Sequence, residues 1–214
     1  MKHMTQRFLI SLTLVTCLGG ALTACAPVVL GGAVVGGLVA TDRRTSGAQL
    51  EDEGIELRSA SRIRDNLGDR GHVNVNSYNR RVLLTGEVPS LQDKQLVEQI
   101  VSRVDNVQAV INELAVLGNA TLTQRSSDSL VTGKVKAGLV DAKDLYANAF
   151  KVVTERGITY LMGRVTQREA DRATDITRST GGVQKVVRVF EYISEDELRN
   201  LLPQPAPESK QTKP

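Results

Sequence analysis

The chain has 214 residues, a formal net charge of +3, 41% hydrophobic and 3% aromatic residues, and no Trp. If residues 1–24 are set aside as an export signal, 25 basic and 24 acidic side chains remain in 190 residues. This near balance and the scarcity of aromatic side chains argue against a nucleic-acid-binding protein, which normally carries a basic excess and aromatic or arginine-rich reading surfaces. The length suits one large domain or two small ones.

Residues 1–24 have the features of a secretory signal peptide. Lys2 and Arg7 form a positive start, and Phe8 to Gly20 form an apolar stretch too short to remain as a stable membrane anchor. The segment ends in "LTAC" at residues 22–25, which resembles a bacterial lipobox. The resemblance implies that Cys25 is lipidated on its sulfur and becomes the first residue of the mature protein. An ordinary signal peptide followed by an accidental cysteine is the alternative.

Cysteine usage agrees with lipidation. Cys17 leaves with the signal, so the mature chain keeps a single cysteine, Cys25, and has no intrachain disulfide. Ala26 follows it, and by the sorting rule for bacterial lipoproteins this implies the outer membrane. Residues 25–49 then read as a glycine-rich tether, because the apolar run at 27–40 is shorter than the ~20 residues of a membrane helix. It is either a flexible linker or a segment lying at the bilayer surface.

The remainder contains an internal duplication. "LTGEV" at residues 84–88 and "LMGRV" at 161–165 are separated by 77 residues, and the strands before them match at the same offset. Beyond Pro89 the offset becomes 76 and continues through "VQAV" at 107–110 and "VQKV" at 183–186. One inserted proline explains the change. We therefore expect two domains, at residues 50–120 and 121–195.

Each copy predicts the order helix, strand, strand, helix, strand. Apolar residues recur about every 3.6 residues in the expected helices and about every 2 residues in the expected strands. In the first copy Asp52 is the expected N-cap of a helix that Gly68 and Gly71 close. The expected elements that follow are a strand from Val73, a turn at 78–80, a strand at 81–88, a helix capped by Ser90 and ended by Asn106, and a strand at 107–116.

In the second copy Leu130, Val135 and Leu139 mark the first helix. The expected elements that follow are strands at 150–154 and 158–165 around an Arg156-Gly157 turn, a helix with a Thr166/Glu169 capping box that Gly181-Gly182 stops, and a strand at 183–193. The fold class is α+β, with two tandem αββαβ sandwiches. Gly86 and Gly163 occupy equivalent places in the central strands, where we expect a bulge or a close backbone approach rather than a catalytic role.

With "L-x-G-x-V" in the central strand and "G/N-V-x-x-V" in the closing strand, both copies resemble BON domains. Two copies behind a lipobox resemble the dual-BON-domain outer-membrane lipoproteins, the DolP/YraP family. The resemblance implies a non-enzymatic, periplasm-facing protein that supports outer-membrane integrity. It also implies binding of anionic phospholipid (phosphatidylglycerol or cardiolipin) through the first helix of the second domain, and association with the outer-membrane assembly machinery.

Charge supports a lipid role for the second domain. Residues 50–120 carry 8 basic and 11 acidic side chains, whereas residues 121–195 carry 12 and 9. The candidate phospholipid-binding residues are Leu130, Lys134, Lys136, Leu139 and Lys143. A solvated helix face with Leu130 in the core is the alternative. Leu130 also stands where some relatives carry a bulky aromatic residue with a stronger preference for the membrane interface.

The sequence offers no pattern for a metal site, a catalytic site or a cofactor site. His72 is the sole histidine of the mature chain, so we expect no metal cluster, no nucleophile–histidine pair, no cofactor and no enzymatic activity. Residues 196–214 are proline-rich and polar and are predicted to be a disordered tail. Two functions stay open: an anionic-phospholipid-binding lipoprotein, or a periplasmic scaffold for outer-membrane protein assembly in which lipid contact is incidental.

Overall fold

The computed structural model describes residues 42–201 of the chain. The predicted signal peptide, Cys25, most of the tether and residues 202–214 lie outside this range. Both repeats belong to one compact unit of the chain. The order of elements confirms the predicted α+β fold with two αββαβ copies.

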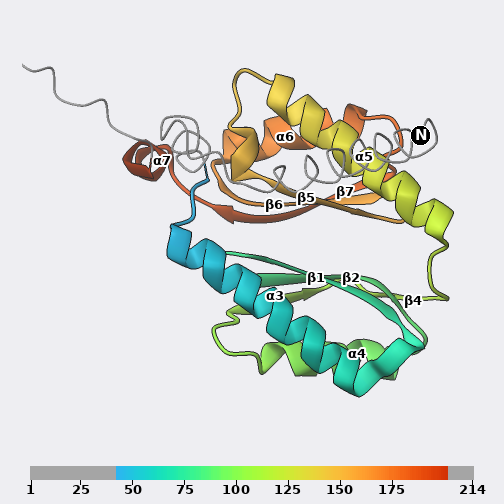
Figure 1. Cartoon of the computed structure of the whole chain (residues 1–214). Coiled ribbons are helices and arrows are strands. Elements are labelled where there is room, and N and C mark those ends of the chain that lie inside the picture. The colour runs from blue at the N-terminus through green and yellow to red at the C-terminus, as the bar shows by residue number, and fades with distance from the viewer. Residues whose placement is uncertain (1–41, 202–214) are drawn as a thin grey trace, which may run out of the picture. The chain divides into compact units, whose positions relative to one another are not determined.

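The first repeat places two helices over one face of a small mixed sheet (Figure 1). Its elements are α3 (Ser46–Leu67), the short 3-10 turn η2 (Gly68–Arg70), β1 (His72–Tyr78), β2 (Arg81–Val88), α4 (Leu91–Ser102), β3 (Ala109–Asn112) and β4 (Ala115–Val116). β1 pairs antiparallel with β2, and both β3 and β4 run parallel to β2. The predicted third strand is therefore two strand segments, interrupted where the buried Leu114 turns into the core.

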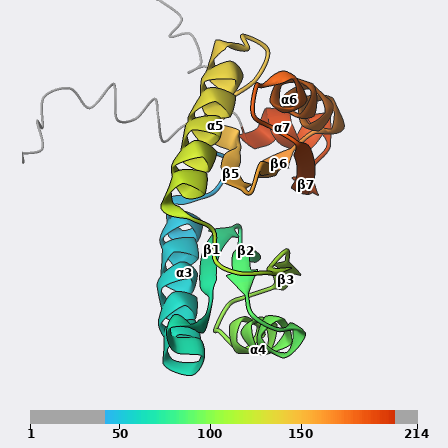
Figure 2. The ribbon, with the colours of Figure 1, turned by 90° about the vertical axis from the view of Figure 1, so that its right-hand side faces the viewer.

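The second repeat has the same plan (Figure 2). Its elements are α5 (Leu122–Asp141), the 3-10 turn η3 (Ala147–Ala149), β5 (Lys151–Glu155), β6 (Ile158–Val165), α6 (Gln167–Ser179), β7 (Lys185–Tyr192) and α7 (Glu195–Leu201). β5 is antiparallel and β7 parallel to the central strand β6. The start of the predicted disordered tail is thus the helix α7, in which Leu198 is buried and Glu197 pairs with Arg164.

Helix starts follow local chemistry, with one correction. Ser90 accepts a hydrogen bond from the amide of Asp93, and Thr166 and Glu169 form the predicted capping box. Asp52, however, does not cap α3, because that helix begins earlier and Thr45 caps it. The Asp52 side chain is instead buried and accepts hydrogen bonds from the chain around the β1–β2 turn.

Each repeat has its own apolar core between helices and sheet. The first contains Ile55, Ile63, Leu67, Val82, Leu84, Val88, Val97, Val101 and Leu114. The second contains Val131, Val135, Leu139, Ala142, Leu145, Ala149, Phe150, Val152, Leu161, Val165, Ala170, Ala173 and Phe190. The alternation along the central strands sends every second residue into these cores and the others to the opposite face of the sheet.

The opposite faces of the two sheets share a third apolar cluster. It joins Tyr78 and Leu83 of the first repeat to Tyr160, Met162 and Val189 of the second. Polar contacts surround it: Asn74 donates to Glu155, Asn79 to Glu191, and the Tyr78 hydroxyl to the carbonyl of Ala149. The central strands β2 and β6 are therefore buried on both faces, and the repeats pack sheet against sheet.

Gly86 and Gly163 lie where two backbones approach closely, as the sequence predicts. A Cβ on Gly86 would stand 2.1 Å from the carbonyl oxygen of His72, and one on Gly163 would stand 2.4 Å from that of Ala149. Gly86 also has a φ of +109°, which side-chain-bearing residues rarely adopt. Both glycines thus serve the strand pairing at the start of each hairpin.

Candidate functional site

Helix α5 is positioned by its ends and by one buried stripe. Thr121 and Gln124 form a capping box at its start. Val131, Val135 and Leu139 then follow at helical spacing and pack into the core against β5. This stripe fixes the rotation of the helix, so that the face opposite to it is turned toward solvent.

That solvent face carries three exposed apolar side chains. Leu122, Leu130 and Val140 have exposed fractions of 81%, 68% and 69%. At about 100° of rotation per residue these three side chains fall within about 80° of one another on the helix. The same arc includes the exposed positions Ser126, Gly133 and Ala137. We call these six residues the outer strip of α5, of which Ser126 is the polar member.

Lysines flank the outer strip on both sides. Lys134 lies about 40° beyond Leu130, and Lys136 lies about 40° before Val140. Lys143 lies two residues beyond the end of α5 at Asp141. All three are exposed. Among residues 42–201, ion pairing by lysine is confined to Lys151 with Glu56, so Lys134, Lys136 and Lys143 have no ion-pair partner there.

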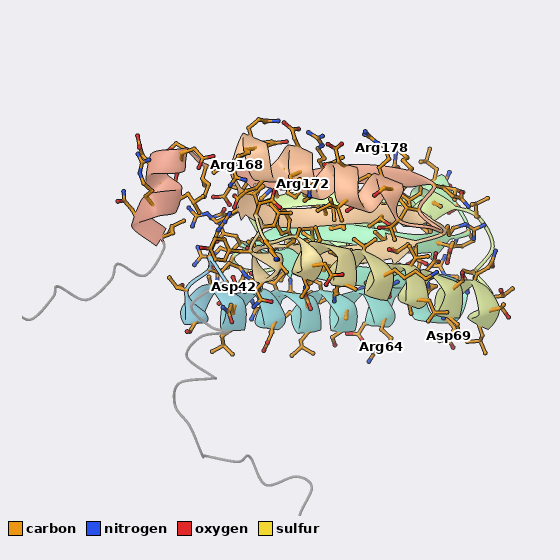
Figure 3. All side chains as sticks on the ribbon, turned by 90° about the horizontal axis from the view of Figure 1, so that it is seen from above. Asp42, Arg64, Asp69, Arg168, Arg172 and Arg178 are labelled. Atoms are coloured by element: carbon orange, nitrogen blue, oxygen red, sulfur yellow. The ribbon has the colours of Figure 1, made fainter. Side chains whose placement is uncertain are left out.

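The arginines of the adjacent helix α6 have acidic partners. Figure 3 labels Arg168, Arg172 and Arg178 along α6. Their acidic partners are Glu195 at 4.0 Å, Asp144 at 3.2 Å and Asp175 at 3.7 Å. Free positive charge is therefore a property of α5 and not of the adjacent helix.

The structure separates the five predicted lipid-binding residues into two groups. Leu130, Lys134 and Lys136 are exposed on α5, and Lys143 is exposed in the turn that follows it. Leu139 has an exposed fraction of 1% and lies in the core of the second repeat, so its assignment to the lipid site is corrected. Leu122 and Val140 were not predicted as part of the site, although a helical wheel centred opposite Val135 places them on the same side of α5 as Leu130.

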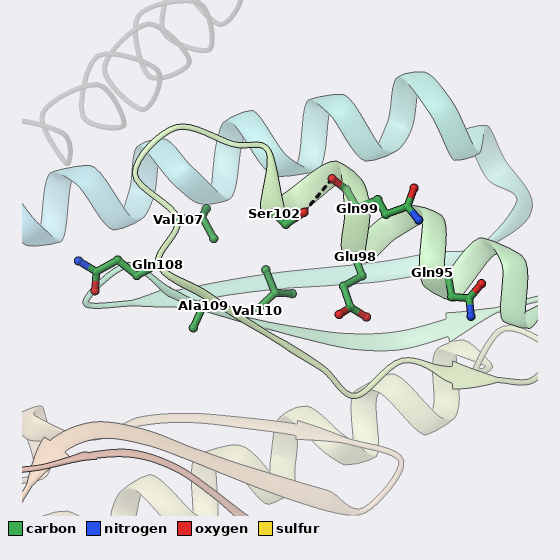
Figure 4. A pocket seen from close by; sticks show the side chains of 8 residues that line it. All are labelled: Gln95, Glu98, Gln99, Ser102, Val107, Gln108, Ala109 and Val110. Atoms are coloured by element: carbon green, nitrogen blue, oxygen red, sulfur yellow. Dashed lines mark hydrogen bonds between the residues drawn. The ribbon is translucent and has the colours of Figure 1, made fainter.

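A separate groove in the first repeat lies between α4 and the edge strand β3 (Figure 4). Its lining is mixed amide and apolar, and includes Gln95, Glu98, Gln99 and Val110. Glu98, its carboxylate, accepts a hydrogen bond from Asn112, and Ser102 donates to the carbonyl of Gln99. Neither group is paired with a base or nucleophile there, so the groove has no arrangement for acid–base or covalent catalysis.

In the part of the chain that the structure describes, no helix combines the length and the apolar composition that crossing a bilayer requires. The molecule is thus built from two small α+β domains, and α5 carries apolar side chains both in the core and on its exposed face.

Comparison with known proteins identifies these domains. The BON domain model matches residues 51–118 and 127–194. The chain is 38% identical over 174 residues to the outer membrane lipoprotein DolP of Haemophilus influenzae. This alignment covers 80% of this chain and 90% of that protein. It therefore belongs to the dual-BON-domain outer-membrane lipoproteins of the DolP/YraP family, which are non-catalytic proteins.

Two further similarities extend the comparison. The chain is 30% identical over 154 residues to a 21 kDa hemolysin of Actinobacillus pleuropneumoniae, with coverage of 71% of this chain and 79% of that protein. A solved structure of CdsD, a structural protein of the type III secretion system of Chlamydia trachomatis, aligns over 69% of this chain at 15% identity with a TM-score of 0.29. That structural likeness is too slight to carry an argument.

Proposed function

We propose that this outer-membrane lipoprotein is anchored by acylated Cys25, faces the periplasm and binds anionic phospholipid through the outer face of α5, and that this binding helps to maintain the envelope. The observation that carries the proposal is the placement of Lys134 and Lys136, which have no ion-pair partner among the described residues, on either side of the outer strip, with Lys143 just beyond the end of the helix. No catalytic step forms part of it.

The energetics favour an anionic surface over a neutral one. Each Lys near such a surface contributes about 1 kcal/mol, and salt weakens the attraction. Leu130 and Val140 add apolar area that can enter the headgroup boundary without disturbing the core, because both are exposed in the folded protein. The acyl anchor at Cys25 supplies the affinity for the bilayer itself, and α5 adds headgroup preference.

Sedimentation with vesicles tests this proposal. The non-acylated protein spanning residues 26–214 is mixed with phosphatidylcholine or phosphatidylglycerol-rich vesicles at low and high salt. This length keeps Arg43 and Arg44, which pair with Glu169 and Asp52 in the fold. We expect salt-sensitive binding to the anionic vesicles, weakened about 30-fold in Lys134→Glu/Lys136→Glu through the loss of about 2 kcal/mol.

Arg168→Glu/Arg172→Glu is the matched control, because it changes the net charge equally on α6, where the arginines are already paired. Binding that survives in this control and is lost in the α5 variant supports α5. Equal loss in both would show that net charge alone matters. If the unaltered protein binds neither vesicle, Cys25 is the sole membrane contact and a protein-scaffold role becomes the better explanation.

A further inference from the structure

Three potential metal ligands from both repeats converge at one end of the sheet-to-sheet interface. His72 begins β1 and is directly opposite Glu87 of β2 in the antiparallel register. Glu155 ends β5 in the second repeat. One ligand atom from each of the three side chains lies within 4.8 Å of the others. The sequence predicts no metal cluster because it has one mature histidine, but folding adds two distant carboxylates to that histidine.

Hydrogen bonds hold the Glu87 and Glu155 carboxylates in place, and few cationic groups pair with them. Glu87 is fully buried, and its oxygens face the Ala120 amide and the Arg156 guanidinium, each at 3.2 Å. Glu155 has an exposed fraction of 7% and accepts one hydrogen bond, from Asn74 at 2.7 Å. Arg156 pairs with Glu87, and no ion pair to Glu155 is found among the described residues.

The imidazole supplies the third ligand and an independent indication. His72 Nδ1 lies 3.4 Å from Glu87 Oε2, is shielded from solvent, and has no hydrogen-bond partner among the described residues. A buried polar atom without a partner is uncommon and calls for an explanation. In a tetrahedral zinc site, bonds of about 2.0–2.2 Å place ligand atoms about 3.3–3.6 Å apart. The observed separation of these two atoms falls in that range.

We propose that His72, Glu87 and Glu155 form a Zn²⁺ site that joins the two BON domains, with water as the fourth ligand. The imidazole nitrogen favours Zn²⁺ over Mg²⁺ or Ca²⁺, which prefer all-oxygen ligand sets. The ligand atom of Glu155 lies within 4.8 Å of those of His72 and Glu87. The His72 side chain is 22% exposed, so the ion has an entry path from solvent.

The duplication shows that the site is specific to one end of the interface. At the offset of 77, His72 and Glu87 correspond to Ala149 and Arg164, and Glu155 corresponds to Tyr78. At that other end the Tyr78 hydroxyl donates to the carbonyl of Ala149, and no metal-binding set results. The repeats therefore diverged so that one end of the interface is closed by direct contacts and the other by potential metal ligands.

The test uses the tag-free full-length lipoprotein, purified in detergent and stripped with a chelator. Equilibrium dialysis against Zn²⁺, Ca²⁺ or Mg²⁺ gives stoichiometry and affinity, and Co²⁺ substitution reports tetrahedral geometry by visible absorption. We expect one Zn²⁺ per chain and a higher unfolding temperature with Zn²⁺. Because loss of a residue that only orients a metal ligand costs roughly 10- to 100-fold in affinity, His72→Ala and Glu155→Gln should each weaken binding by at least that factor.

Glu53→Gln is the matched control, since Glu53 is an exposed carboxylate on α3 and is not one of the three ligands. It should keep both the bound Zn²⁺ and the Co²⁺ spectrum. Far-UV circular dichroism of each metal-free variant establishes that it is folded before binding is measured. Absence of a stoichiometric Zn²⁺ in the unaltered protein, equal affinity for Ca²⁺, or unchanged Zn²⁺ binding in His72→Ala and Glu155→Gln would each overturn the site.

Discussion

Asp52 and Asp128 are buried carboxylates at equivalent positions in α3 and α5. Asp52 accepts hydrogen bonds from the amides of Asn79 and Arg80, and Asp128 from those of Arg156 and Gly157, at 2.7–2.9 Å. All four turn residues have positive φ values between 50° and 74°, as a tight hairpin turn requires. Each helix thus holds the hairpin turn of its own repeat. A local reading of Asp52 as an N-cap could not show this, because its partners are more than 20 residues away.

Another buried carboxylate, Glu169, leads to a pH prediction. Burial alone would raise the pKa of Glu169, but hydrogen bonds from Arg43 and the Thr166 amide, with the Arg43 charge, lower it on balance. A lowered folded-state pKa stabilises the fold at pH values above the unfolded value of about 4.3, and this stabilisation is lost as pH falls through the folded-state pKa. We expect the free energy of unfolding, measured with urea, to fall as the pH drops below about 4.3. This fall should be smaller in the double variant Arg43→Met/Glu169→Gln than in the unaltered protein.

The single variants sharpen this prediction. Because either one leaves a buried charge without its partner, Arg43→Met and Glu169→Gln should each lower the free energy of unfolding at pH 7 by about 3 kcal/mol. The double variant should lose less than the sum of the two. An additive double variant, or an unchanged acid dependence, would show that the pair does not act as a unit.

At the scale of the element, α5 contains a glycine that packing does not require. A Cβ on Gly133 would meet nothing within 4 Å, so Ala can replace Gly there without a clash. Gly133→Ala should raise the free energy of unfolding by about 0.8–1 kcal/mol, because Ala loses less backbone entropy in a helix. Gly138→Ala on the same helix is the control, since its Cβ would lie 3.1 Å from Ile176. Equal gains at both positions in denaturant unfolding would contradict this account.

At the scale of the whole molecule, the sheet-to-sheet cluster predicts that the repeats unfold together. Leu83 and Met162 are fully buried in it and belong to different repeats. Calorimetry should therefore show a single unfolding transition in which both repeats unfold. Leu83→Asp places an unpaired charge in the cluster and should split this transition into two. Val116→Asp, at a position 45% exposed on β4, should leave it single. Two transitions in the unaltered protein would contradict the coupling.

The candidate lipid site could be predicted in part. The charge contrast between the repeats and the positions of Lys134, Lys136 and Lys143 were evident because charged residues on a helix are solvent-exposed by default. Which of Leu130 and Leu139 is exposed was not, since both fit an approximate helical spacing. That choice depends on the rotation of α5, which Val131 and Val135 fix by packing on β5.

The sequence by itself determined the duplication, the αββαβ order, the hairpin turns and the helix caps at Ser90 and Thr166. These features depend on residues a few positions apart, so local periodicity and capping chemistry suffice. Only the tertiary structure decided that the sheets meet face to face and that His72, Glu87 and Glu155 gather between them. The physical reason is that these contacts join residues far apart in the chain, and their geometry follows from how two folded sheets pack.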